Sequence, residues 1–145
     1  MSKSSIDYRI DVHDPQAHLF RVTLRVPAPA APQRVSLPVW IPGSYLVREF
    51  GRHLTALQAR QGRRRVPLQQ IDKTTWQADC RGDQVLEIEY LVYAFDSSVR
   101  TAFLDAHRGF FNATSLCLRV EGRESAPHTV ALGKLPRGWQ VASAM

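Results

Sequence analysis

The chain has 145 residues, of which 44% are hydrophobic and 22% charged, which fits one folded domain and excludes intrinsic disorder. Lysine and arginine outnumber aspartate and glutamate by 19 to 13, a formal net charge of +6 that raises nucleic acid as a partner class. The one dense basic run, at 60–65, surrounds Gly62 and contains no aromatic residue. Because single-stranded nucleic-acid sites combine arginine with stacking aromatics, we interpret this run as a solvated hairpin tip and predict no nucleic-acid partner.

The N-terminal sequence MSKSSIDYRI lacks the apolar core of a signal peptide, and no run of about 18 apolar residues could cross a bilayer. We therefore predict no membrane association and a cytoplasmic location. The two cysteines, Cys80 and Cys117, lack metal-ligand spacing. Cys117 lies in an apolar strand pattern and is predicted to be a buried free thiol, whereas Cys80 is expected to be partly exposed beside a turn.

Hydrophobic and polar residues alternate with a period of two in five segments, which are, in chain order, 6–12, 20–26, 35–39, 86–92 and 114–120. This period is typical of strands that bury one face. Turn residues separate the segments, and we interpret 81–83, the triplet Arg-Gly-Asp, as a turn that closes a hairpin before Val85. The pattern predicts an all-β chain, a single antiparallel β-sandwich over 1–145, with at most a short helical turn in the 97–108 loop.

Sequence signatures of common catalytic centres are missing. The five histidines are His13, His18, His53, His107 and His128, and no two are four residues apart, as the zinc-binding H-E-x-x-H helix requires. The serine nucleophile elbow, the P-loop and the dinucleotide glycine fingerprint do not occur either. We predict that this chain holds no metal ion and no catalytic residue.

Three tryptophans, Trp40, Trp76 and Trp139, are interpreted as core anchors near strand ends, because a buried aromatic ring removes a large apolar area from water. The alternative is a role in ligand stacking. On that reading the chain is an independent β-sandwich module for peptide or carbohydrate, with Trp40, Tyr45 and Trp76 forming an exposed and roughly coplanar platform.

Two segments do not follow the strand pattern. The first, LPVWIPGSYLVREF at 37–50, combines two prolines and a glycine with aromatic and charged residues. The second contains about seventeen residues between Phe95 and Ala113, which is longer than an ordinary hairpin connection. It mixes aromatic and charged residues, which indicates packing against the sandwich or against a partner.

These segments resemble a known family. WIPGSYLVREF at 40–50, DKTTW at 72–76, YAFDSSVRTAFLDAHRGFFNATSL at 93–116 and PRGW at 136–139 are similar to the N-terminal domain of metallopeptidase family sixty-one, the glycyl-aminopeptidase type with a PDZ domain. The resemblance implies a β-rich domain in front of a thermolysin-like zinc domain, whose H-E-x-x-H motif binds the metal and supplies the general base. On this reading the chain is a non-enzymatic fragment, and the zinc ligands and the PDZ domain belong to the parent enzyme.

In the parent enzyme, the implied partners are the catalytic domain of the same protein and a peptide substrate at the cleft edge. We expect the candidate contacts in the two unusual segments: Tyr45, Arg48, Glu49, Arg100, Asp105, Phe110, Phe111 and Asn112. Phe110 and Phe111 would form an apolar wall of the cleft, and Asn112 would offer an amide. The alternative is that both phenylalanines pack into the sandwich and that Asn112 caps a turn. An exposed docking surface would also let the fragment self-associate.

Overall fold

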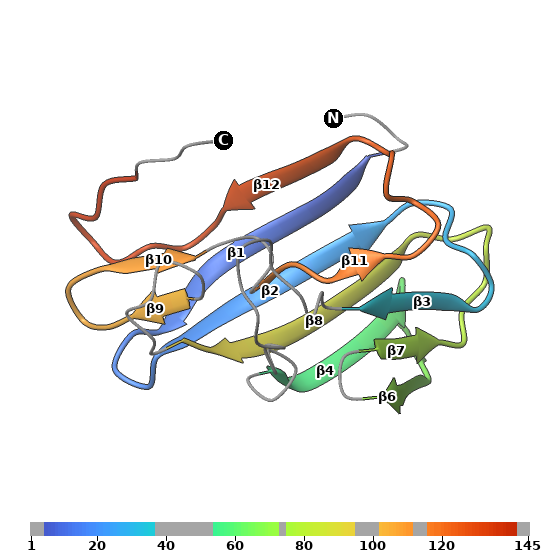
Figure 1. Cartoon of the computed structure of the whole chain (residues 1–145), viewed down its shortest axis with the longest axis horizontal. Coiled ribbons are helices and arrows are strands. Elements are labelled where there is room, and N and C mark those ends of the chain that lie inside the picture. The colour runs from blue at the N-terminus through green and yellow to red at the C-terminus, as the bar shows by residue number, and fades with distance from the viewer. Residues whose placement is uncertain (1–4, 37–53, 73–74, 95–101, 112–115, 142–145) are drawn as a thin grey trace, which may run out of the picture.

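The computed structural model describes residues 5–36, 54–72, 75–94, 102–111 and 116–141. Every regular element in these ranges is a strand, and the strands form two facing layers and a small hairpin (Figure 1). The prediction of an all-β sandwich is therefore confirmed. None of the described residues forms a helix long and apolar enough to cross a membrane.

The larger layer is a six-stranded sheet with the order β12-β1-β2-β8-β4-β5. Its strands are β1 (Ile6–Asp14), β2 (Leu19–Val26), β4 (Leu54–Gln61), β5 (Arg64–Val66), β8 (Leu86–Tyr93) and β12 (His128–Leu132). Neighbouring strands are antiparallel except β1 and β12, which are parallel. The predicted segments 6–12, 20–26 and 86–92 thus become three adjacent strands at the centre of the sheet.

The second layer is a four-stranded sheet with the order β11-β3-β7-β6, which lies in front of the larger sheet in Figure 1. It contains β3 (Gln33–Ser36), β6 (Leu68–Asp72), β7 (Thr75–Ala78) and β11 (Arg119–Val120). The chain passes from one sheet to the other at Pro67, between β5 and β6. A proline cannot donate to a strand ladder, so it suits this corner. Its carbonyl accepts a hydrogen bond from the Asp79 backbone N–H at 2.9 Å.

The core lies between the two sheets and is built from the alternating hydrophobic residues of both. The six-stranded sheet contributes fully buried side chains from three of its central strands, including Ile6, Ile10, Val22, Leu24, Leu86 and Ile88. The facing sheet contributes Val35 and Trp76, of which Trp76 is only 5% exposed. Trp139 packs partly buried against the same cluster. Trp76 is therefore a core residue, as predicted, whereas Trp139 lies partly buried at the margin of the core and Trp40 lies outside the described residues.

The predicted strand at 114–120 is largely wrong. Within its described part, only Arg119 and Val120 pair with β3, and residues 116–118 are not in a strand. Their side chains still follow the expected burial, because Leu116 and Leu118 are fully buried. The prediction followed the side-chain pattern correctly, but a strand backbone does not form at residues 116–118.

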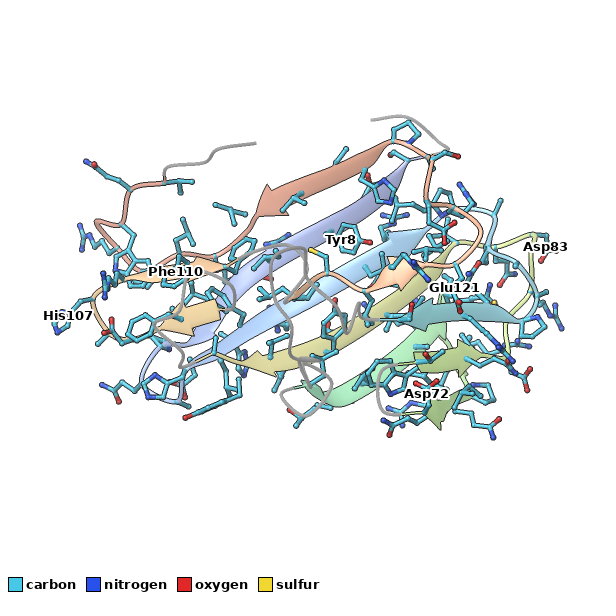
Figure 2. The ribbon with its side chains drawn as sticks, in the orientation of Figure 1. Tyr8, Asp72, Asp83, His107, Phe110 and Glu121 are labelled. Atoms are coloured by element: carbon cyan, nitrogen blue, oxygen red, sulfur yellow. The ribbon has the colours of Figure 1, made fainter. Side chains whose placement is uncertain are left out.

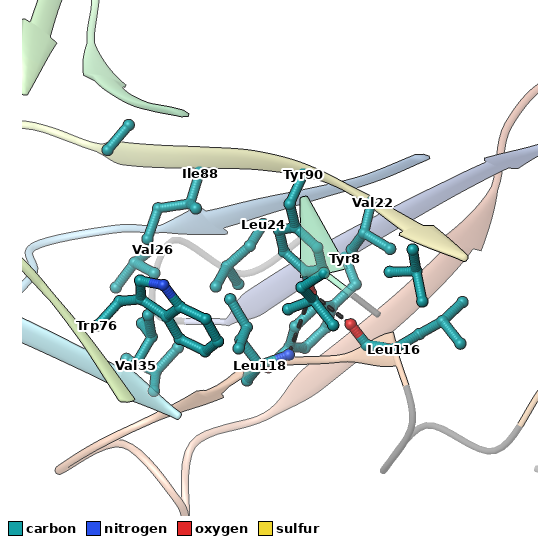
Figure 3. Close-up of a cluster of buried hydrophobic side chains, with 14 of the residues drawn as sticks. Tyr8, Val22, Leu24, Val26, Val35, Trp76, Ile88, Tyr90, Leu116 and Leu118 are labelled. Carbon is teal, nitrogen blue, oxygen red and sulfur yellow. Dashed lines mark hydrogen bonds between the residues drawn. The ribbon is translucent and has the colours of Figure 1, made fainter. Parts of the chain in front are cut away.

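Two tyrosines of the larger sheet take the place of that strand ladder (Figure 3). The Tyr90 hydroxyl donates to the Leu116 carbonyl and accepts from the Leu118 backbone N–H at 3.1 Å. The Tyr8 hydroxyl donates to the Leu118 carbonyl. Because buried backbone groups need partners, these hydroxyls allow an irregular segment to cross the core. Cys117 lies in this segment, half-buried, and the surrounding protein raises the pKa of its thiol to about 12.

Two further expectations are corrected. The segment 79–85 does not close a hairpin, because it leads from β7 in the small sheet to β8 in the large one. Cys80 at its start is buried rather than partly exposed, and its thiol donates to the Ala30 carbonyl at 3.1 Å. Gln61 holds the same connection from β4, since its side-chain amide binds the Arg81 N–H and carbonyl. The connection is thus fixed to β4 and to the connection between β2 and β3.

The chain that follows β12 is tied to β1. The Gly133 N–H donates to the Ile10 carbonyl, and the buried Asp11 carboxylate accepts from the Lys134 N–H at 2.6 Å. Arg9 and Arg21 form ion pairs with the same carboxylate at 3.3 and 3.6 Å. A β-carbon at position 133 would lie 1.8 Å from the Asp11 Oδ1, so only glycine fits there. The direction in which the chain leaves the sheet is therefore set by the edge of β1.

Candidate functional site

Three of the eight predicted contact residues fall in the described part of the chain: Asp105, Phe110 and Phe111. They share one element, the hairpin of β9 (Ala102–Leu104) and β10 (Gly109–Phe111). The other five, Tyr45, Arg48, Glu49, Arg100 and Asn112, lie outside the described residues. The described part of the 97–108 loop is therefore a strand and a turn. The structure brings together part of the proposed site on a hairpin that the sequence pattern did not predict.

Asp105 shapes the tip of this hairpin. Its carboxylate accepts hydrogen bonds from the backbone N–H groups of His107 and Arg108, at 2.8 and 2.9 Å. Its own N–H donates to the Arg108 carbonyl at 2.9 Å. The two backbone donors stabilise the charged form and lower the pKa of the Asp105 carboxyl. The immediate role of Asp105 is to hold the turn.

The two phenylalanines lie on opposite faces of the hairpin. Phe111 packs partly buried against the core, edge-on to Phe20 of β2 with 5.7 Å between ring centroids. Phe110 lies on the face turned away from Phe20 and stacks on Phe103, its cross-strand neighbour, at 6.2 Å and 14°. The Arg108 guanidinium lies 5.2 Å from the Phe103 ring centroid. Phe111 thus packs into the sandwich, which was the alternative interpretation. Phe110 does not, and it remains a candidate contact to the substrate cleft.

The hairpin is fixed to the end of the large sheet. The Leu104 N–H donates to the Ala94 carbonyl, and the Ala94 N–H donates to the His18 carbonyl, both at 2.8 Å. The His18 ring Nδ1 lies 2.5 Å from the Leu104 carbonyl oxygen. A β-carbon at Gly109 would lie 2.9 Å from a Leu104 methyl and 3.3 Å from the Phe20 ring, so the strand approaches closely. The Phe103–Phe110 pair is therefore presented on an anchored element.

Figure 2 shows His107 and Phe110 at one end of the molecule, and Asp83 and Glu121 at the opposite end. The sequence interpretation did not identify Phe103 and Arg108 as parts of the aromatic cluster. The signal that could have found them is the spacing of Phe103 and Phe110 about a turn held by an Asp, which suits cross-strand neighbours in a hairpin.

The aromatic platform proposed for an independent binding module is incomplete. It required Trp76 to be exposed, whereas Trp76 is 5% exposed within the core. Trp40 and Tyr45, its other two members, lie outside the described residues. Among the described residues no group of three or more His, Cys, Asp or Glu side chains could hold a metal ion. The Phe103–Phe110 hairpin is accordingly the best-defined candidate contact site.

Comparison with known protein families assigns nearly the whole chain to one family. The sequence profile of the family described as Peptidase M61 N-terminal domain matches residues 7–145. The chain belongs to this family. The four motifs on which the resemblance rested, at 40–50, 72–76, 93–116 and 136–139, all fall inside the matched range.

A solved structure agrees with this assignment. The M61 N-terminal domain described above is similar to the crystal structure of an aminopeptidase N family protein from Idiomarina loihiensis, with 44% sequence identity and a TM-score of 0.86. The similarity covers 90% of this chain but 22% of that chain, so the domain spans less than a quarter of its solved relative. No curated protein sequence matched.

Proposed function

We propose that this M61 N-terminal domain is the non-catalytic β-domain of a zinc-dependent aminopeptidase of the glycyl-aminopeptidase type. In this role it scaffolds the catalytic domain and forms part of one wall of the substrate cleft. The observation that carries the proposal is the family match over 7–145, combined with a 44% identical aminopeptidase-family relative of which the domain spans 22%. The catalytic domain and a peptide substrate are then its partners, in the cytoplasm.

Zinc is assigned to the rest of the parent enzyme. The described residues provide no set of three or more His, Cys, Asp or Glu side chains that could hold an ion, so they do not fit a catalytic zinc site. No step of zinc chemistry is therefore attributed to this domain. Its proposed contribution is to bind and orient the substrate, and to exclude water beside a reaction that other residues perform.

The contact that we assign to the cleft is the outward face of the β9–β10 hairpin. Phe110 offers an apolar surface backed by Phe103, and Arg108 places a positive charge beside it. Such a surface suits an apolar substrate side chain or a neighbouring loop of the catalytic domain. In the 145-residue chain Phe103 is only 9% exposed and Phe110 is partly buried, so Phe110 and Arg108 are the residues of this face that a partner can reach.

The coding sequence downstream of codon 145 tests the parentage. We expect an in-frame H-E-x-x-H motif and a later glutamate, the ligand set of a thermolysin-like zinc site. A natural stop codon directly after codon 145 would contradict the proposal and favour an independent module.

A further inference from the structure

A row of arginines crosses the outer face of the six-stranded sheet, away from the core. Strand register places Arg25 of β2 beside Glu87 of β8, Glu87 beside Arg60 of β4, and Arg60 beside Arg65 of β5. All three arginines are exposed. With strands about 4.8 Å apart, the row spans about 14 Å. The basic run at 60–65 therefore becomes, in the fold, one end of a longer line that includes Arg25.

Two hollows lie along this row. The smaller measures about 200 Å³ and is lined by Gln58, Ala59, Arg60, Arg63, Arg65, Glu87 and Glu89. The larger measures about 660 Å³ and includes Arg25, Arg60, Gly62, Arg63, Val85 and Glu87 in its lining. Arg63, at the tip of the β4–β5 hairpin, borders both, as do Arg60 and Glu87. The surface is thus concave where the arginines gather.

The charges of the row are only partly balanced, although register also places Asp7 of β1 beside Arg25. The Arg60 guanidinium binds Glu87, with its Nε 3.1 Å from the carboxylate, and this bond raises the pKa of Arg60. In the described part of the chain, the recorded ion pairs include none for Arg25, Arg63 or Arg65. Arg60 and Arg65 are direct cross-strand neighbours, and like charges in that position destabilise a sheet. A bound anion would relieve this repulsion.

We infer that the arginine row binds an acidic polypeptide segment through its carboxylates. A guanidinium offers a planar pair of donors that matches a carboxylate. A run of about four to five extended residues covers the 14 Å length of the row, at about 3.3 Å per residue. A single-stranded nucleic acid fits less well, because no aromatic side chain lines either hollow for its bases to stack on. The row lies at the opposite end of β2 and β8 from the Phe110 hairpin, because Arg25 pairs with Glu87 at one end and the hairpin is tied to His18 and Ala94 at the other.

Fluorescence anisotropy with the 145-residue chain and a labelled octaglutamate peptide tests this inference. The variant Arg63→Gln/Arg65→Gln removes two exposed charges from the row. The control Arg119→Gln/Arg137→Gln removes two exposed charges from β11 and the C-terminal segment, so the formal net charge falls equally. A neutral octaserine peptide and a thymidine octanucleotide serve as comparison probes, at low and physiological ionic strength.

We expect octaglutamate binding that weakens with added salt and exceeds that of the other two probes. Arg63→Gln/Arg65→Gln should weaken it about 5- to 30-fold, the result of losing two partly exposed ion pairs. The control variant should weaken octaglutamate binding by about twofold at most, because it lowers only the overall net charge of the domain. Equal losses in the two variants, no binding of octaglutamate above octaserine, or tighter binding of the oligonucleotide would each overturn the inference. None of these outcomes depends on whether the parent is a peptidase.

Discussion

Tyr90 lies fully buried between the sheets, with its hydroxyl in contact with the backbone of Leu116 and Leu118. Burial raises the pKa of this hydroxyl well above its usual value, so it remains protonated and can donate to the Leu116 carbonyl. The same oxygen accepts from Leu118. One phenol therefore satisfies two backbone groups of a segment that has no strand neighbour there.

Replacing Tyr90 by Phe keeps the ring and removes both hydrogen bonds. We expect Tyr90→Phe to lower the free energy of unfolding by about 1–3 kcal/mol, because two buried backbone groups lose their partner. Tyr8→Phe is the matched variant, since it removes a single bond, to the Leu118 carbonyl, and should cost less. Urea denaturation of both variants measures the difference. Equal stability of Tyr90→Phe and the unmodified domain would refute the role assigned to this hydroxyl.

The thiol of Cys117 makes stability depend on alkaline pH. Burial disfavours the charged thiolate and raises the pKa of this thiol from its ordinary value of about 9 to about 12 in the folded domain. The unfolded chain therefore releases this proton first as the pH rises. The stabilising contribution is complete below a pH of about 9 and is lost as the pH rises through about 12.

We predict that the free energy of unfolding falls between a pH of about 8 and one of about 10.5. The fall should be smaller in Cys117→Ala, which has no thiol to titrate, while Tyr8 and Tyr90, whose pKa values are also raised by burial, keep part of it. Urea denaturation at the two pH values provides the comparison. An identical fall in both proteins would show that Cys117 does not contribute.

At the level of elements, the strands that the sequence predicts best are those that pair regularly. β2 and β8 alternate along their whole length, and β1 alternates from Ile6 to Ile10, because one face of each strand meets the core and the other meets water. β4 was not predicted, because its pairing with β8 shifts register between Thr55 and Gln58, where Ala56 has a φ of 56°. A bulge of this kind breaks the period of two that identifies a strand.

The sequence-based predictions for the segment 114–120 and for the β9–β10 hairpin were wrong for opposite reasons. The first has a strand-like side-chain pattern, but Leu116 and Leu118 bond through their backbones to tyrosine hydroxyls that no local pattern reveals. The second forms strands of three residues each, too short for a periodic signal. Its turn is held by a single carboxylate, that of Asp105. Aspartate is also common in irregular loops, so its presence alone does not predict a hairpin turn.

The hairpin leads to a prediction for the proposed longer enzyme. If Phe110 lines the cleft, Phe110→Ala should raise the KM for short glycyl or alanyl peptides about fivefold, the effect of losing about 1 kcal/mol of apolar contact. The kcat should change little, because the residue contacts substrate away from the reacting bond. Steady-state kinetics on a peptide series measures both constants.

Ile71→Ala provides the matched control for Phe110→Ala. Ile71 is 41% exposed in β6 of the small sheet, next to Asp72, which Figure 2 places far from the hairpin. This variant should leave KM unchanged. Thermal melting of both variants verifies that each remains folded. An unchanged KM in a folded Phe110→Ala enzyme would argue against a cleft role for the hairpin.

Across the whole molecule, the sandwich separates two surfaces of different chemistry. The aromatic hairpin lies at one end, and the concave arginine row lies at the other, beside the turn that contains Asp83. The sequence predicted the basic tip and the aromatic loop as separate runs. The sequence did not predict that Arg25 lies in one row with Arg60 and Arg65, or that Phe103 pairs with Phe110. Strand register, rather than distance along the chain, decides which of these residues are neighbours.

The family was predictable from sequence, because motifs such as WIPGSYLVREF are long and unusual, and the match over 7–145 confirms it. The roles of single residues were harder to predict. Asp105 was expected as an interdomain contact, and the structure gives it a local role in the turn. Phe110 and Phe111, adjacent in the chain, take opposite faces of one hairpin.

The most direct test of the central claim is an aminopeptidase assay that compares the proposed longer gene product with the 145-residue chain at equal molar concentration. We predict that the longer product releases N-terminal glycine or alanine, loses this activity to a chelator and regains it with zinc. The 145-residue chain alone should release nothing above background. Cleavage by the isolated chain, or a folded, zinc-supplied longer product that cleaves no peptide, would contradict the account.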